Sequence, residues 1–302
     1  MTERTLEGRT ALITGAGRGL GKAMAEGLAA RGARITLVDL ENDVLAAAVA
    51  DVEAAGGQGC ALPLAADVTD TQRATEVVQE TISSFGGLDI LINDAAMGPQ
   101  FFSNDITGEG PKFWEVDNDL WLRVLTVHAF GPQLMASAVV PHMIGQAWGR
   151  IINVTTSLDT MFLSGCGAYG PSKASLEANT RVMAHDLNGT GVTANVLIPG
   201  GPANTRMITE ATGIPREDLI QPDVMQAPAA WLCSGEADDT SGMRFIAALW
   251  DDSLPLADRF ERAGAPTAWA QIPSKAIRPD SVASSTDNFS PSGKARHERS
   301  RI

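Results

Sequence analysis

Short apolar runs and amphipathic stretches alternate along most of the chain. The apolar runs predict strands at 11–13, 34–39, 60–65, 88–92, 150–154, 192–198 and 243–248. Between them, apolar residues recur at helical spacing and predict helices after residue 21 and over 42–55, 71–85, 119–140, 169–187 and 227–233. Alternation of this kind indicates parallel strands joined by right-handed crossovers. We therefore expect a doubly wound α/β fold, mostly a seven-stranded parallel sheet with helices on both faces.

Three segments depart from this alternation. Residues 97–116 carry four large aromatic side chains among prolines and glycines, which predicts a loop that covers a pocket or packs on a neighbouring subunit. Residues 201–226 are polar and contain prolines, which is typical of a lid. After residue 255 the periodicity weakens. We expect one domain over 1–255, and a C-terminal extension over 256–302 that is partly disordered or packed on a partner subunit.

Composition narrows the class of protein. A net charge of −13 disfavours a nucleic-acid partner, since no basic stripe is present to meet phosphates. The three cysteines are widely spaced and lack metal-binding or disulfide patterns, so we expect no metal site and a reducing, cytoplasmic location. The first eight residues carry charges and no apolar core, and no later run approaches 18 apolar residues. We therefore expect no export signal and no membrane partner.

A glycine-rich turn joins the first strand to the first helix. Its residues are Thr14-Gly15-Ala16-Gly17-Arg18-Gly19-Leu20-Gly21. Glycines at this place let the backbone approach a diphosphate, whose charge is favoured by the free N–H groups of the helix. A tight strand-to-helix connection without a ligand is the alternative.

Asp39 ends the second strand, 18 residues beyond Gly21. A carboxylate there accepts hydrogen bonds from both ribose hydroxyls of NAD and repels the 2′-phosphate of NADP. NAD is therefore favoured as the cofactor, although Arg18 in the turn keeps NADP open. In the alternative interpretation Asp39 only caps the next helix, a role that Asn42 also fits.

Tyr169 is the only tyrosine in the chain, and Lys173 follows it by one helical turn. A phenol has a pKa of about 10, so it acts as a base at neutral pH only beside a cation such as this lysine. Thr155-Thr156-Ser157 leaves the buried strand 150–154, and Thr156 lies 13 residues before the tyrosine. An ordinary exposed Tyr–Lys pair and local backbone bonding of the hydroxyls remain the alternatives.

Together these motifs resemble the short-chain dehydrogenase/reductase family, over about residues 6–248. The glycine turn is similar to the family's TGxxxGxG, Asp39 to the acidic residue of NAD-preferring members, and Tyr169–Lys173 to the YxxxK pair. The resemblance also assigns roles to Asp67 and Val68 at the adenine, Asn93 at the start of NNAG, and Pro199, Gly200 and Thr205 at the nicotinamide. It implies a Rossmann-like catalytic domain.

Three positions depart from the family pattern. Thr156 stands where the family has its catalytic serine, with Ser157 next to it. His128 stands where the family has the asparagine that supports a proton relay, and is the candidate to take over that relay with added pH dependence. Asp94 and Ala96 replace the second Asn and the Gly of NNAG.

The resemblance implies an NAD-dependent oxidoreductase that interconverts a secondary alcohol and a ketone by hydride transfer. Tyr169 would be the general base or acid, Thr156 would orient the substrate oxygen, and Lys173 would also hold the nicotinamide ribose. The family usually forms homodimers or homotetramers, which we expect here. Candidates for the substrate wall are Phe101, Trp114, Ser157, Phe162 and Met207. An NADP-dependent ketoreductase and a non-catalytic NAD-binding sensor or scaffold remain the alternatives.

Overall fold

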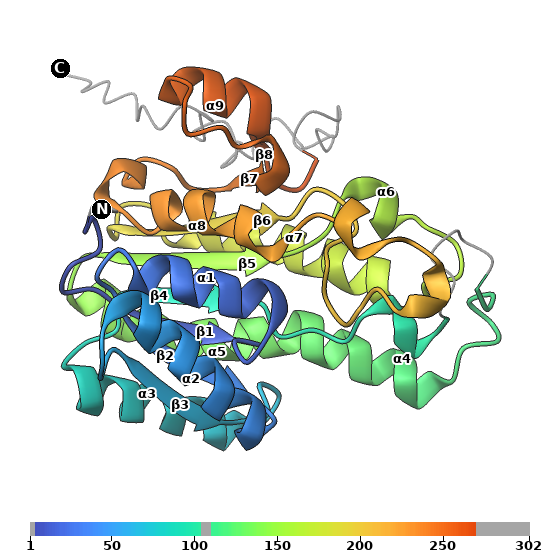
Figure 1. The fold of residues 1–302 in the computed structure, drawn as a ribbon, viewed down its shortest axis with the longest axis horizontal. Coiled ribbons are helices and arrows are strands. Elements are labelled where there is room, and N and C mark those ends of the chain that lie inside the picture. The colour runs from blue at the N-terminus through green and yellow to red at the C-terminus, as the bar shows by residue number, and fades with distance from the viewer. Residues whose placement is uncertain (1–3, 104–109, 270–302) are drawn as a thin grey trace, which may run out of the picture.

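The computed structural model describes residues 4–103 and 110–269, which form one sheet covered by helices on both faces (Figure 1). Its strands, in spatial order β3-β2-β1-β4-β5-β6-β7-β8, are β1 Thr10–Thr14, β2 Arg34–Asp39, β3 Ala61–Ala65, β4 Ile90–Asn93, β5 Gly149–Val154, β6 Val192–Ile198, β7 Met243–Ile246 and β8 Gly264–Pro266. The first seven are parallel and β8 is antiparallel to β7. The predicted doubly wound α/β fold is confirmed.

The helices form two layers because the central strands bury both faces. One layer holds α1 Gly19–Ala29, α2 Asn42–Gly56 and α8 Gln226–Leu232. The other holds α3 Thr71–Phe85, α5 Gly131–Gly145 and α7 Tyr169–Asp186. Short helices complete the described chain: α4 Asn118–Leu125, α6 Leu158–Met161 and α9 Leu256–Ala263, a π-helical segment Thr126–Phe130, and 3₁₀ turns at Pro99–Phe101, Glu210–Thr212, Arg216–Asp218, Pro222–Met225, Gly235–Ala237 and Ala247–Leu249.

The segments α4, Thr126–Phe130 and α5 run on as one helix from Asn118 to Gly145. Within the described residues it is the one helix whose length and composition would suffice to cross a membrane. Core helices of globular folds meet the same criterion, and this one packs against α3 and α7 over the sheet. It therefore carries no argument for a membrane.

Residues 256–269, the described part of the C-terminal extension, form a helix and a strand that the sequence pattern did not predict. Phe260 of α9 packs edge-on against Trp231 and Phe245, with ring centroids 5.3 and 5.2 Å apart, and β8 then extends the sheet. This first part of the extension packs on its own domain, because its aromatic side chain completes a cluster that the periodicity did not reveal. Residues 104–109 of the insertion and 270–302 of the extension lie outside the described residues.

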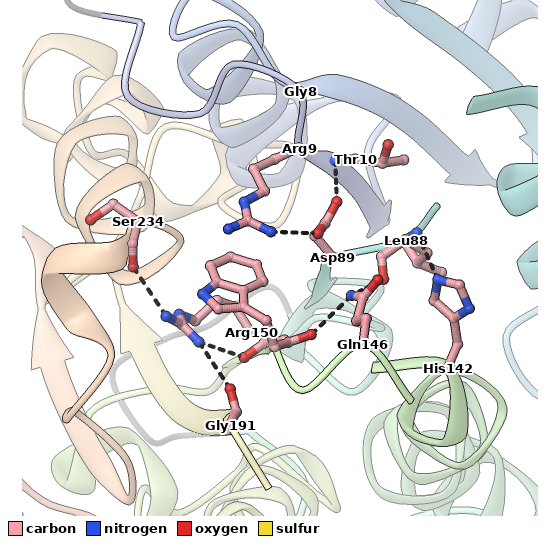
Figure 2. Close-up of polar contacts among 12 residues, drawn as sticks. Gly8, Arg9, Thr10, Leu88, Asp89, His142, Gln146, Arg150, Gly191 and Ser234 are labelled. Atoms are coloured by element: carbon pink, nitrogen blue, oxygen red, sulfur yellow. Dashed lines mark hydrogen bonds and ion pairs between the residues drawn. The ribbon is translucent and has the colours of Figure 1, made fainter. Parts of the chain in front are cut away.

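The amino edge of the sheet is held by arginines (Figure 2). The guanidinium groups of Arg9 and Arg150 each lie over the Trp148 ring, at 3.6 and 4.0 Å from its centroid. Arg9 pairs with Asp89, and the fully buried Arg150 donates to the carbonyls of Gly149, Gly191 and Ser234. This cluster lies at the start of β5, at the opposite end of that strand from Thr155.

Candidate active site

A cavity of about 690 Å³ opens at the carboxyl edge of the parallel strands. Open α/β sheets hold their ligands at this edge. The cavity wall brings together most of the residues that the sequence singled out: Gly15, Arg18, Gly19, Leu20, Asp39, Asp67, Val68, Pro199 and Thr205 from the cofactor set, Thr156, Tyr169 and Lys173 from the catalytic set, and Phe101 and Met207 from the substrate set.

Three of the proposed substrate residues lie outside this wall. Trp114 and Phe162 are 69% and 74% exposed, because the loops that carry them turn their rings outward. Ser157 is the N-cap of α6, and its hydroxyl accepts the Thr160 N–H. The placement of these three residues thus differs from the sequence-based prediction.

Three of the predicted cofactor residues, Asn93, Gly200 and Gly21, do not line the cavity. Asn93 is buried and donates to the side chain of Asn153 on the neighbouring strand. Gly200 has φ +111°, a conformation that favours glycine. Gly21 lies where a Cβ would come within 2.4 Å of the Gly15 carbonyl oxygen.

The glycine turn is closely packed and leaves the start of α1 open. Gly15 has φ +67°, and a Cβ there would meet the Ala95 amide nitrogen at 2.8 Å. Arg18 is the N-cap of α1 but makes no side-chain capping bond, and no acidic residue occupies the first turn. The amides at the start of α1 are therefore suited to an anionic group of a ligand.

Asp39 lines the cavity from the end of β2. Its Oδ2 accepts the Gly17 N–H at 3.1 Å and its Oδ1 accepts the Leu40 N–H at 2.8 Å. Helix α2 begins at Asn42 after Glu41, so Asp39 does not cap it. The Arg18 guanidinium pairs with Glu41 at 2.5 Å, and Arg206 in segment 201–226 approaches the same carboxylate at 3.5 Å.

Tyr169 opens α7 and lines the same cavity. Burial raises the pKa of its phenol to about 12, while hydrogen bonding to the Thr156 side chain acts in the opposite direction. Lys173 donates from Nζ to the Val154 carbonyl at 2.8 Å. Burial lowers the pKa of this lysine to about 8, and the nearby Asp94 carboxylate opposes that shift. In the protein without ligand, Tyr169 is therefore a neutral phenol.

Asp94 brings a carboxyl group to a position where the family pattern has an amide. Burial raises its pKa to about 7, and both the Lys173 charge and a hydrogen bond from the Gly21 N–H oppose that increase. The backbone N–H of Asp94 donates to Thr14 Oγ1 at 3.1 Å, which fixes the strand end beneath the glycine turn. Near neutral pH this carboxyl is close to its midpoint of ionisation.

His128 lies in the middle of the π-helical segment, and its side chain is fully buried. Nε2 accepts the Met97 N–H at 2.9 Å, so Nδ1 carries the proton and donates to Ser172 Oγ at 2.7 Å. Burial, with a further contribution from the Lys173 charge, holds its pKa well below the usual value. Both ring nitrogens are occupied, which leaves no free position for the proton relay that the sequence suggested. The ring instead packs edge-on against Tyr169 with centroids 5.5 Å apart.

Sequence reasoning missed two charged residues beside the catalytic strand. Glu177 is fully buried one turn beyond Lys173, and Arg244 lies in β7. A carboxylate continuing the buried Tyr–Lys face of α7 was the available signal for Glu177. A charged residue within the final apolar strand was the signal for Arg244.

The glycine turn, the acidic end of β2 and the Tyr–Lys pair around one cavity define the site of a nicotinamide-dependent oxidoreductase. Residues 9–213 match the family model described as short chain dehydrogenase. The chain belongs to the short-chain dehydrogenase/reductase family, and is an NAD(P)-dependent enzyme acting on CH–OH donors.

Individual relatives agree with this assignment. The chain is 31% identical to a short-chain type dehydrogenase/reductase of Picea abies, over 67% of this chain and 73% of that protein. It is 28% identical to the 2-dehydro-3-deoxy-L-rhamnonate dehydrogenase (NAD(+)) of Sphingomonas sp. (strain SKA58), over 87% and 96%. The crystal structure of a metagenomic short-chain oxidoreductase in complex with NADP superposes with a TM-score of 0.67 at 26% identity, covering 80% of this chain and 97% of that one.

Proposed function

We propose that this enzyme interconverts a secondary alcohol and a ketone with NAD as the cofactor, and that Tyr169 is the general base or acid. The observation that carries the proposal is the placement of the Tyr169 phenol. It lines the same cavity as the glycine turn, the Thr156 hydroxyl interacts with it, and Lys173 occupies the next turn of its helix. This arrangement would allow the phenol to exchange a proton with a substrate oxygen bound in the cavity.

The residues around the cavity fit a dinucleotide. The uncapped start of α1 would hold the diphosphate, Asp39 the adenosine ribose, and Asp67 with Val68 the adenine. Pro199, Gly200 and Thr205 would flank the nicotinamide, and Asn93 would support the strand end behind it. When bound, the cofactor supplies the hydride chemistry, and the protein supplies alignment and charge.

Proton transfer is the task of this chain's own side chains. With a pKa of about 12, the Tyr169 phenol is a weak base until a positive charge comes near it. Lys173, with a pKa of about 8, keeps its proton at neutral pH and supplies one such charge. Thr156 holds the substrate oxygen against the phenol, which sets the distance over which the proton moves.

The preference for NAD over NADP rests on three charged groups. A 2′-phosphate beside Asp39 would meet a carboxylate, and Arg18, the cation of the glycine turn, is already paired with Glu41. Phe101 and Met207 give the rest of the cavity an apolar wall, which suits an apolar or aromatic alcohol.

We also propose a cytoplasmic homodimer or homotetramer. The exposed apolar side chains of Leu122 and Phe130 on the long helix support self-association.

A panel of secondary alcohols tests this function, read by the absorbance of reduced nicotinamide with NAD and with NADP in parallel. We expect turnover of at least one apolar or aromatic alcohol, with a higher kcat/KM for NAD. Turnover supported only by NADP would contradict the cofactor assignment. Absence of turnover with both cofactors across alcohols and ketones, in protein that binds NAD, would contradict the catalytic assignment.

A further inference from the structure

Three consecutive residues at the end of β5 are each held by a charged side chain. The Val154 carbonyl accepts from Lys173 Nζ at 2.8 Å. The Thr155 hydroxyl donates to Glu177 Oε2 at 3.1 Å. The Thr156 carbonyl accepts from Arg244 Nη2 at 2.9 Å. The backbone that carries the catalytic hydroxyl is thus fixed residue by residue.

Glu177 and Arg244 form a buried ion pair. Arg244 Nε lies 3.2 Å from Glu177 Oε1, and the side chains are only 11% and 1% exposed. The Glu177 carboxylate also accepts the Ala268 N–H of the segment that follows β8. Taking two charges out of water is unfavourable unless both are paired and hydrogen-bonded, so removing either partner leaves the other uncompensated.

A single residue, Thr156, links the ion pair to the Tyr169 phenol. Tyr169, Lys173 and Glu177 recur every four residues and therefore share one face of α7. Arg244 reaches the Thr155–Thr156 turn from β7, which is two strands away from β5 in the sheet. Thr156 receives Arg244 on its carbonyl and presents its side chain to Tyr169.

We propose that the Glu177–Arg244 pair is a positioning device that fixes the Thr155–Thr156 turn and thereby sets the Thr156 hydroxyl against the Tyr169 phenol. Neither residue touches the substrate in this account. A guanidinium suits the task because its planar fork reaches a carboxylate with one nitrogen and a carbonyl with another, whereas a lysine ammonium presents a single nitrogen. Arg244→Lys therefore keeps the positive charge but loses the simultaneous contact with the Glu177 carboxylate and the Thr156 carbonyl.

The single tyrosine gives this proposal a readout that needs no substrate. Protein labelled with ¹³Cζ-tyrosine shows one NMR resonance from the whole chain, and that resonance reports the surroundings of the Tyr169 hydroxyl. Thr156→Val removes the hydroxyl next to Tyr169, so it shows how far and in which direction the resonance moves when that hydroxyl is lost. Arg244→Lys is the test variant, and Glu177→Gln is the second one should the first fail to fold.

Arg150→Lys is the matched control. Arg150 is a buried arginine on β5, the strand that leads to Thr155 and Thr156, and it is ion-paired with Asp238. It also binds carbonyls at the opposite edge of the sheet (Figure 2). It shares the burial and the chemistry of Arg244 but lies away from Thr156. A general loss of stability would affect both variants, whereas a loss of positioning affects only the first.

We expect the Tyr169 resonance of Arg244→Lys and of Glu177→Gln to move in the same direction as that of Thr156→Val, and that of Arg150→Lys to stay at the wild-type position. Unmoved resonances in both pair variants, an equal movement in Arg150→Lys, or an unmoved resonance in Thr156→Val would each overturn the proposal.

The consequence for catalysis rests on the proposed function. With a productive alcohol, Arg244→Lys should lower kcat about tenfold at unchanged KM for NAD, because a displaced hydroxyl misaligns the substrate without altering the cofactor site. The resonance test does not depend on turnover. An inactive wild type would therefore refute the proposed function and leave the positioning proposal to be decided by the spectra.

Discussion

Asp94→Asn should stabilise the protein, and the gain should grow as the pH rises. The substitution preserves the shape of the side chain and an acceptor for the Gly21 N–H, while it removes the ionisable group. Burial raises the pKa of Asp94 from 3.8 to about 7. Between these two values the native carboxyl binds its proton and the unfolded one does not. The free energy of unfolding of the wild type therefore falls as the pH rises through this range.

The pKa of Asp94 sets the upper limit of this effect. A shift of about three pKa units corresponds to roughly 4 kcal/mol at pH 7. Lys173 reduces the gain, because its ammonium is stabilised by the Asp94 charge and loses that support in the variant. We therefore expect a difference on the order of 1–4 kcal/mol at pH 7 that shrinks toward zero near pH 4.

Urea unfolding of the cofactor-free wild type and variant, followed by tryptophan fluorescence at several pH values, measures this difference. Burial holds the pKa of His128 well below its usual value, so we expect its contribution to be similar in both proteins. A variant that is less stable than the wild type at pH 7, or a difference that does not change with pH, would refute the assignment of a raised pKa to Asp94.

Two further substitutions test the cofactor end and the buried histidine. Asp39→Asn should lower the ratio of NAD to NADP affinity by about tenfold or more, because the carboxylate that repels a 2′-phosphate is gone; titration of each cofactor against tryptophan fluorescence measures it, and an unchanged ratio would be evidence against the role of Asp39. His128→Ala should lower the free energy of unfolding by about 2–4 kcal/mol, since it leaves a cavity and an unpaired Met97 N–H; denaturant unfolding checks this, and a variant as stable as the wild type would contradict the structural role of His128.

The fold and most of the site were accessible from the sequence because their signals are local. Strand and helix periodicity predicted the parallel sheet, and the glycine turn, Asp39 and Tyr169–Lys173 are motifs with fixed spacing. Parallel strands then carry these motifs to one edge, so their convergence on a single cavity follows from the topology.

Features that depend on distant contacts were not predictable in this way. The ion pair of Glu177 and Arg244 joins residues 67 positions apart, and β8 forms only because β7 offers a free edge. The family pattern identified His128 as unusual, but the sequence did not predict which groups its ring would bond. That bonding depends on the loop that brings the Met97 amide to the ring. The outward rings of Trp114 and Phe162 likewise depend on loop paths that no periodicity encodes.

The central claim is that Tyr169 transfers the proton during alcohol oxidation. Tyr169→Phe keeps the aromatic ring and removes only the hydroxyl, so the cofactor site should stay intact. The decisive measurement is the rate of NAD reduction by a productive alcohol, taken together with NAD affinity in the same preparation. We predict a loss in kcat of about 10²-fold or more at unchanged NAD affinity; a variant that turns over as fast as the wild type would show that another group transfers the proton.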